Sequence, residues 1–177
     1  MSHTITLICG TNRKDAISLH VTQFYEKLLK QLGCDTVLLD LTQLPQDFAF
    51  TALYENFGKN EAFNYYVDIM LKSERYVFII PEYNGSFPGA LKTFVDGLEY
   101  PHTFRNKKGA LVGLASGGHG ASLALSHFTD ILNFRGLNIL AYKPRLDHIE
   151  QYVENGVLTN AKYAQMLEKQ AEMLVEF

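Results

Sequence analysis

The 177-residue sequence contains only two cysteines, Cys9 and Cys34. They form no CxxC pair, and no histidine or further cysteine stands nearby at the spacing of zinc ligands. This pattern excludes a disulfide framework and argues against a structural metal site. We therefore expect two buried, reduced thiols and no bound metal.

The sequence also lacks a segment long and apolar enough to span a membrane, and residues 1–10 lack the basic start of a secretion signal. We therefore expect a cytoplasmic protein without membrane contact. The formal net charge is −3 and the pI is about 6.1. A nucleic-acid surface would need clustered lysine and arginine, so the expected partner is a small molecule.

Hydrophobic residues make up 47% of the chain and charged residues 20%, which fits one globular domain over residues 1–177. Apolar runs rich in β-branched residues predict five strands. The runs are TITLICG (4–10), CDTVLLDL (34–41), YVFII (76–80), the start of GALVGLASGG (109–118) and LNILAY (137–142).

Apolar residues at helical spacing follow each of these strands. They predict helices from Ser18 to near Gly33, around Phe63–Leu71, around Leu91–Leu98, over 121–134 and around Tyr163–Leu174. The least regular segment is Leu41–Asn60, which is aromatic without a clean period. We expect it either to cover a neighbouring subunit or to be mobile.

Continuous apolar strands that alternate with amphipathic helices predict a parallel sheet covered on both faces. The expected fold class is α/β, a flavodoxin-like three-layer α/β/α sandwich with a five-stranded parallel sheet in the order 2-1-3-4-5. In that order the loops after the first, third and fourth strands meet at the carboxyl edge, where such sheets bind ligands.

The first loop, GTNRKDAIS (10–18), combines the hydroxyls of Thr11 and Ser18 with the guanidinium of Arg13 just before a helix. Free backbone N–H groups, the helix dipole and a guanidinium together form an anion site that suits a phosphate monoester. In the alternative interpretation, Ser18 is a helix N-cap and Arg13 a solvated charge. Neither GxGxxG nor GxxxxGK[ST] is present.

The second loop, PEYNGSFP (81–88), has a composition that favours presentation of backbone groups. Gly85 frees the local backbone, while Pro81 and Pro88 stiffen the two ends. We expect the N–H groups around Asn84–Ser86 to donate to the heteroatoms of a flat ring. The alternative is an ordinary turn.

Two side chains of this loop carry further expectations. Tyr83 is expected beside the flat ring, or on the surface if the loop is an ordinary turn. Glu82 is interpreted as a hydrogen-bond acceptor and not as a catalytic base, because a lone carboxylate at a strand end more often accepts hydrogen bonds.

The third loop, SGGHGA (116–121), offers Ser116 and two glycines, Gly117 and Gly118, where a backbone can approach a ligand closely. His119 has no evident nucleophile as a partner, so we interpret it as a solvent-facing or substrate-edge residue. No GxSxG motif and no paired carboxylates stand out, which argues against a hydrolase.

The segment PEYNGSFPGALKTFVD (81–96) closely matches PEYNxSxPGxLKNxxD, the hallmark of the NADPH-dependent FMN reductase family. The chain resembles that family, which includes quinone, azo-dye and chromate reductases, over essentially its whole length. GTNRKDAIS stands where the family has its GSxRxxS phosphate loop. Thr11 replaces the commoner serine, the loop is spaced differently, and Thr93 replaces the usual asparagine after Lys92.

The resemblance implies FMN as cofactor and NADPH or NADH as hydride donor. It implies that the flavin carries the chemistry, so no catalytic side chain is expected. The implied contacts with the FMN phosphate are Thr11, Asn12, Arg13, Ser18 and the following amide of Leu19. The implied contacts with the FMN ring are Pro81, Glu82, Tyr83, Asn84, Gly85, Ser86, Ser116, Gly117 and Gly118.

The resemblance also implies a small-molecule electron acceptor, such as free flavin or a quinone, and a homodimer or homotetramer with the helix after PEYNGSFP at the interface. Two other functions stay open, a flavin-binding electron carrier that does not use nicotinamide and a scaffold that has lost the cofactor. The candidate aromatic contacts at the interface are Phe87, Phe94, Tyr100 and Phe104, and core packing is the alternative for some of them. The candidate cations for a 2′-phosphate of NADPH are Arg13, Arg105, Lys107 and Lys108.

Overall fold

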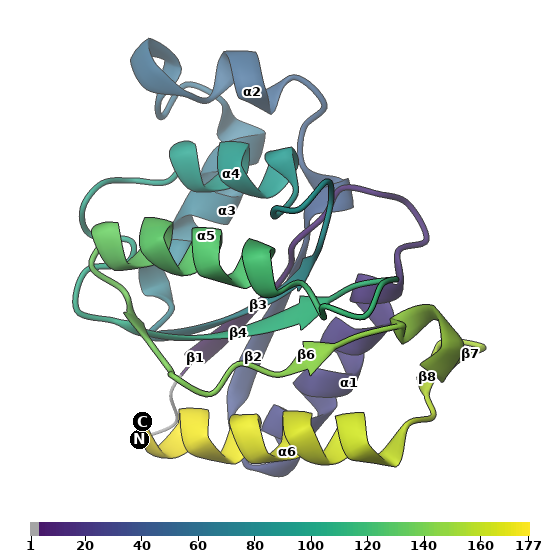
Figure 1. The fold of residues 1–177 in the computed structure, drawn as a ribbon. Coiled ribbons are helices and arrows are strands. Elements are labelled where there is room, and N and C mark those ends of the chain that lie inside the picture. The colour runs from purple at the N-terminus through teal and green to yellow at the C-terminus, as the bar shows by residue number, and fades with distance from the viewer. Residues whose placement is uncertain (1–3) are drawn as a thin grey trace.

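The computed structural model describes residues 4–177, and their central element is a parallel sheet with helices on both faces (Figure 1). The strand order is β2-β1-β3-β4-β5, and a sixth strand, β6, also pairs with β4. Every pair in this sheet is parallel. The predicted flavodoxin-like fold and strand order are therefore confirmed. The strands are β1 Thr4–Cys9, β2 Asp35–Asp40, β3 Arg75–Pro81, β4 Lys108–Leu114, β5 Asn138–Ile139 and β6 Arg145–Leu146.

The helices divide into two layers because the sheet presents apolar side chains on both faces (Figure 1). Helices α1 (Ile17–Gln31) and α6 (Ala161–Glu176) cover one face. Helices α3 (Glu61–Lys72), α4 (Gly89–Asp96) and α5 (Ser122–Phe134) cover the other.

Strand β3 shows how one apolar run serves both layers. All seven of its residues are buried. Val77 and Ile79 pack with α1 and α6, whereas Tyr76, Phe78 and Ile80 pack with α3, α4 and α5. Successive side chains of a strand point to opposite faces, so a continuous apolar run is the expected pattern for a strand covered on both sides.

The prediction of one continuous fifth strand over residues 137–142 is wrong, because the structure has two short strands, β5 and β6, at this edge. Ile139 of β5 pairs with Gly109 of β4, and Arg145 of β6 pairs with Gly113 of β4. Between these two pairs the edge of the sheet advances by six residues, whereas β4 advances by only four. The extra residues bulge out between the two short strands. Pro144, which has no N–H to donate, directly precedes β6.

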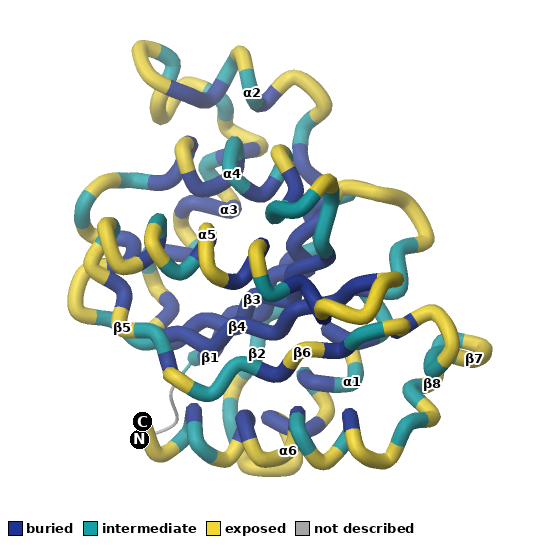
Figure 2. Tube along the Cα trace, in the orientation of Figure 1, coloured by how far each residue is buried: buried dark blue, intermediate teal, exposed yellow. Residues whose placement is uncertain are grey.

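The irregular segment 41–60 forms short helices rather than an extended loop: η1 (Leu41–Gln43), α2 (Phe48–Thr51) and η2 (Tyr54–Asn56). Phe48 is buried and stacks on Phe63 of α3 with 5.4 Å between ring centroids. Phe50 and Tyr54 are largely exposed. The tube around α2 at the top of Figure 2 accordingly alternates between buried and exposed stretches. The inner half of this segment is therefore part of the core.

A small hairpin before α6 was not predicted. Strands β7 (Val153–Glu154) and β8 (Val157–Leu158) pair antiparallel after the short helix η3 (Ile149–Tyr152). Asn155 and Gly156 between them have φ of 49° and 79°. An Asn-Gly pair with two positive φ values is the usual signal of a tight hairpin turn, so this signal was available in the sequence.

Two of the four aromatic residues predicted as interface candidates belong to the core. Phe94 and Phe104 are both fully buried within residues 4–177, so the alternative of core packing holds for them. Phe87 is half-buried and packs on Phe128 with 5.0 Å between ring centroids. Only Tyr100, which is 62% exposed, presents most of its ring to the surface.

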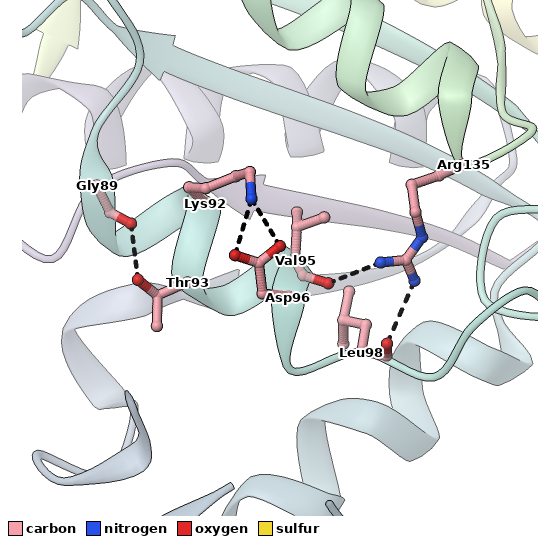
Figure 3. Close-up of polar contacts among 7 residues, drawn as sticks. All are labelled: Gly89, Lys92, Thr93, Val95, Asp96, Leu98 and Arg135. Atoms are coloured by element: carbon pink, nitrogen blue, oxygen red, sulfur yellow. Dashed lines mark hydrogen bonds and ion pairs between the residues drawn. The ribbon is translucent and has the colours of Figure 1, made fainter. Parts of the chain in front are cut away.

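The carboxyl end of α4 depends on Arg135 from the end of α5 (Figure 3). The guanidinium donates to the carbonyl oxygens of Val95 at 3.1 Å, Leu98 at 3.2 Å and Glu99 at 3.0 Å. Burial lowers the pKa of Arg135, and nearby Asp96 opposes that shift. A cation at the C-terminus of a helix satisfies carbonyl groups that the helix leaves unpaired. Arg135 thereby ties α4 to α5.

Replacing Arg135 with methionine should lower the free energy of unfolding by about 1–3 kcal/mol, because three carbonyl groups lose a charged donor. Urea unfolding followed by circular dichroism measures the change. The matched control is Arg105→Met, at an exposed position in the loop between α4 and β4. This variant should change the free energy of unfolding by no more than about 0.5 kcal/mol. Equal stability of the two variants would contradict this role of Arg135.

Candidate functional site

The loops after β1, β3 and β4 converge at the carboxyl edge of the sheet around a pocket of about 200 Å³. Its walls come from the start of α1, the ends of β3 and β4, and the first residues of η3. The lining residues are Arg13, Asp15, Ala16, Ile17, Ser18, Pro81, Glu82, Tyr83, Leu114, Ala115, Ser116, Ile149 and Glu150.

The first loop leaves the start of α1 open toward this pocket. The N-cap position is Ala16, which makes no side-chain cap, and Ser18 is the buried second residue of the helix. The alternative interpretation of Ser18 as an N-cap is therefore wrong. Within residues 4–177, the backbone N–H groups of Ile17 and Ser18 have no acceptor. Such N–H groups at a helix start suit an anion.

Thr11 connects the first loop with the second. It is fully buried, and its hydroxyl lies 2.8 Å from the Tyr83 hydroxyl and accepts the Arg13 N–H at 3.2 Å. The side chain therefore positions Tyr83 and the backbone of Arg13. Arg13 itself is exposed and contributes to the pocket wall.

The second loop is a closed hairpin turn from Tyr83 to Ser86. The N–H and carbonyl groups of these two residues pair at 2.8 Å and 3.1 Å. Asn84 and Gly85 have φ of 51° and 74°, as such tight turns require. The N–H of Ser86 is thus used inside the turn, which corrects its predicted role as a free donor. Ser86 Oγ also lies 3.0 Å from Nδ1 of His127 on α5.

Glu82, beside this turn, carries an unsatisfied acceptor. Its Oε2 atom is buried and has no hydrogen-bond partner among residues 4–177. Its backbone N–H donates to the Leu114 carbonyl at 2.8 Å, which holds the residue at the seam between β3 and β4. A buried polar atom without a partner is costly, and the pocket wall includes this residue, so a ligand N–H would satisfy it.

The third loop contacts residues 148–150, a segment that the sequence motifs did not predict as part of the site. The Ser116 hydroxyl donates to Glu150 Oε1 at 2.6 Å, and His148 Nδ1 donates to the Ser116 carbonyl at 3.0 Å. Glu150 and Ile149 both line the pocket. The residues DHIE (147–150) directly follow β6, which ends with Leu146 paired to Leu114 at the carboxyl edge. The predicted fifth strand stopped at residue 142, so these residues were not placed at that edge.

Several predicted residues lie near the pocket without lining it. Leu19 belongs to an adjoining hollow of about 290 Å³, which shares Arg13, Asp15 and Ala16 with the main pocket. His119 is exposed and lies outside the described lining, in agreement with its interpretation as solvent-facing. The other predicted residues outside the lining are Thr11, Asn12, Asn84, Gly85, Ser86, Gly117 and Gly118.

Three of the four candidate cations for a 2′-phosphate lie at the wrong end of the sheet. Arg105 and Lys107 precede β4, and Lys108 is its first residue, whereas the pocket is at its last. A strand of seven residues spans about 20 Å. Lys107 moreover donates to the Leu71 carbonyl at 2.7 Å. Only Arg13 is left of these candidates.

The two cysteines are free thiols in different environments. Cys9 is buried, and burial together with nearby Asp40 raises its pKa to about 12. Cys34 is only half-buried, which corrects the expectation that both are buried. Across residues 4–177, no group of three or more histidine, cysteine or acidic residues is arranged to hold a metal ion. In the same residues, no helix is long and apolar enough to cross a membrane.

A parallel sheet in this order, with a ligand pocket at its carboxyl edge, defines the flavodoxin-like class of α/β proteins. The model of the NADPH-dependent FMN reductase family matches residues 3–147, and the chain belongs to that family. Membership of this family makes it a nicotinamide-dependent flavin oxidoreductase. No protein with a curated function matches the sequence.

Solved structures with the same fold are similar to nearly the full chain. FerB, a flavoenzyme NAD(P)H:(acceptor) oxidoreductase from Paracoccus denitrificans, has 24% identity and a TM-score of 0.81, with 98% of this chain and 96% of that chain covered. An azoreductase from Bacillus anthracis has 22% identity and a TM-score of 0.62, with 100% of each chain covered. An NAD(P)H:quinone oxidoreductase from Methanothermobacter marburgensis has 14% identity and a TM-score of 0.62, with 98% and 97% covered.

Proposed function

We propose that residues 1–177 act as a single FMN-binding domain that passes hydride from NADPH or NADH, through FMN, to a small two-electron acceptor. The observation that carries this proposal is one pocket whose lining runs from the open start of α1 to the ends of β3 and β4. The first part offers donors for a phosphate, and the second offers polar groups for a ring.

The start of α1 would hold the phosphate of FMN. Ile17 and Ser18 have N–H groups without an acceptor in the described residues, and Arg13 adds a positive charge. Together they supply the donors that a dianionic phosphate needs. Thr11 would act indirectly here, because its hydroxyl already contacts Tyr83 and the Arg13 N–H.

The ends of β3 and β4 would hold the ring of FMN. Glu82 offers a buried carboxylate oxygen that lacks a partner within residues 4–177, a fit for a ring N–H. Tyr83, held by Thr11, and Ser116, held by His148 and Glu150, would border the ring. When bound, FMN supplies the hydride chemistry, so the side chains need only bind and orient the cofactor.

The acceptor is proposed from the kinds of enzyme that share this fold. The structural neighbours include an azoreductase, a quinone oxidoreductase and a flavoenzyme described with an unspecified acceptor. We propose that quinones, azo compounds or free flavin serve as acceptors. We propose both NADPH and NADH as donors, because Arg13 is the one candidate cation for a 2′-phosphate that lines the pocket.

Protein reconstituted with FMN should lose its bound-flavin absorbance promptly when NADPH or NADH is added without oxygen. The measurement is an anaerobic spectrum before and after each donor, followed by addition of a quinone to restore the absorbance. Free FMN at the same concentration is the control. Bound flavin that stays oxidised with both donors would instead indicate an electron carrier, and absence of FMN binding would indicate a scaffold.

Replacing Gly85 with valine should weaken FMN binding at least about tenfold, because a β-branched residue is strained at its φ of 74°. A Cβ at Gly85 would meet only Leu123, at 3.8 Å, so the expected effect comes from the backbone. Gly85→Asn should keep most of the affinity, since asparagine tolerates this conformation. Fluorescence titration with FMN measures the dissociation constants.

Gly58 provides the matched control for this substitution. Its φ is 79° and a Cβ would meet nothing within 4 Å, so Gly58→Val introduces similar strain away from the pocket. The affinity of Gly58→Val for FMN should equal that of the unmodified protein. A Gly85→Val affinity as high as that of Gly58→Val would refute a role of the turn in FMN binding.

We propose further that the chain forms a homodimer or homotetramer through the α4–α5 face, the face formed by α4, α5 and the loop after α4. This face carries a mostly apolar hollow of about 490 Å³. Phe134 and Tyr100 line it and are 79% and 62% exposed, so two large aromatic residues meet solvent at one apolar hollow. Lys92 and Asp96, paired at 2.7 Å, border the same hollow (Figure 3).

Light scattering should give a molar mass of two or four times 20.0 kDa for the unmodified protein. Phe134→Asp should lower that mass, because a charge would be buried in an apolar contact. Leu32→Asp, at a position 42% exposed on the opposite layer, should leave the mass unchanged. A monomeric unmodified protein, or an unchanged mass for Phe134→Asp, would exclude this interface.

A further inference from the structure

We propose that Glu150 lowers the redox potential of the bound flavin by holding a negative charge in the wall of the pocket. The proposal rests on the proposed function, because it concerns the same FMN site. It assigns a role to a residue from η3, beyond the loops that carry the family motifs.

The backbone before Glu150 is anchored to the end of β4. Ile149 is buried, and its N–H donates to the Ala115 carbonyl at 3.1 Å. His148 donates from Nδ1 to the Ser116 carbonyl at 3.0 Å. Two successive residues thus fix the start of η3 against the third loop, and Glu150 follows directly.

The carboxylate of Glu150 is held by one hydrogen bond and no salt bridge. Its Oε1 accepts the Ser116 hydroxyl at 2.6 Å, which is the usual distance for a hydroxyl that donates to a carboxylate, and the pair is exposed to solvent. Among residues 4–177 no lysine, arginine or histidine forms an ion pair with it. The charge is therefore positioned at the pocket but is not neutralised there by a cation.

The pocket wall as a whole carries more negative than positive charge. Asp15, Glu82 and Glu150 contribute carboxylates, and Arg13 contributes the one positive side chain among the lining residues. Arg13 and Asp15 lie in the first loop, near the proposed phosphate end. Glu150 accepts a hydrogen bond from Ser116 at the proposed ring end of the pocket. Glu82 is the other carboxylate at that end.

This charge matters because reduction changes the charge of the ring. A hydride brings two electrons and one proton, so the nicotinamide leaves in its oxidised form and the ring gains one negative charge until a second proton arrives. A fixed carboxylate at the ring end repels the added charge. Reduced FMN is then bound less tightly than oxidised FMN, the midpoint potential falls, and the reduced cofactor becomes a stronger electron donor.

The test is the two-electron midpoint potential of the FMN-loaded protein, measured by anaerobic reductive titration with a reference dye. Glu150→Gln should raise the potential by about 30 mV, which corresponds to about a tenfold change in the ratio of affinities for reduced and oxidised FMN. Glutamine keeps the shape of the side chain and can still accept the Ser116 hydroxyl. The shift should shrink in 1 M salt, where the screening length is only about 3 Å.

Two control variants separate the charge from the hydrogen bond. Glu154 of β7 is exposed like Glu150 but does not line the pocket, so Glu154→Gln removes the same charge and should leave the potential unchanged. Ser116→Ala removes the hydrogen bond but keeps the carboxylate, so its shift should be smaller than that of Glu150→Gln. Equal shifts in Ser116→Ala and Glu150→Gln would assign the effect to the bond and overturn the proposal.

The remaining outcomes distinguish this inference from the proposed function. If FMN binds and is reduced but has the same midpoint potential in Glu150→Gln as in the unmodified protein, the inference about Glu150 is overturned and the proposed function stands. Equal weakening of oxidised and reduced FMN binding by Glu150→Gln gives the same unchanged potential and also overturns it. Failure of the unmodified protein to bind FMN overturns both.

Discussion

The pairing of β3 between β1 and β4 is the constraint on which the site depends. Both faces of β3 are buried, so a shift of register by one residue would exchange the side chains that meet the two helix layers. The register with β4 brings Pro81 beside Leu114. It therefore sets the second loop beside the third, and the pocket lies where these strands end.

Hydrogen bonds between the loops hold the pocket walls in place. Thr11 contacts Tyr83 across the first and second loops, and Ser116 contacts Glu150 across the third loop and η3. Ser86 contacts His127 of α5 in the same way. Side chains held by partners from other elements lose less freedom when a ligand binds, so the site is positioned by the fold as a whole.

The sequence predicted the main strands because apolar runs and helical spacing depend on local neighbours only. Their order followed from the regular alternation of strands and helices, which is typical of doubly wound parallel sheets. The sequence failed at the edge of the sheet, where the two extra residues between β5 and β6 become visible only against the register of β4. It left open whether Phe94 and Phe104 belong to the core or to an interface, because an aromatic residue has the same local pattern in both.

By itself, the sequence determined the fold class, the family and the three loops of the site, since these follow from local periodicity and from a contiguous motif. The tertiary structure alone decided which side chains face the pocket. It added Glu150 from 34 residues beyond Ser116 and turned the hydroxyl of Thr11 toward Tyr83, 72 residues away. Contacts between residues so far apart in the chain depend on strand register and helix packing, which no local pattern encodes.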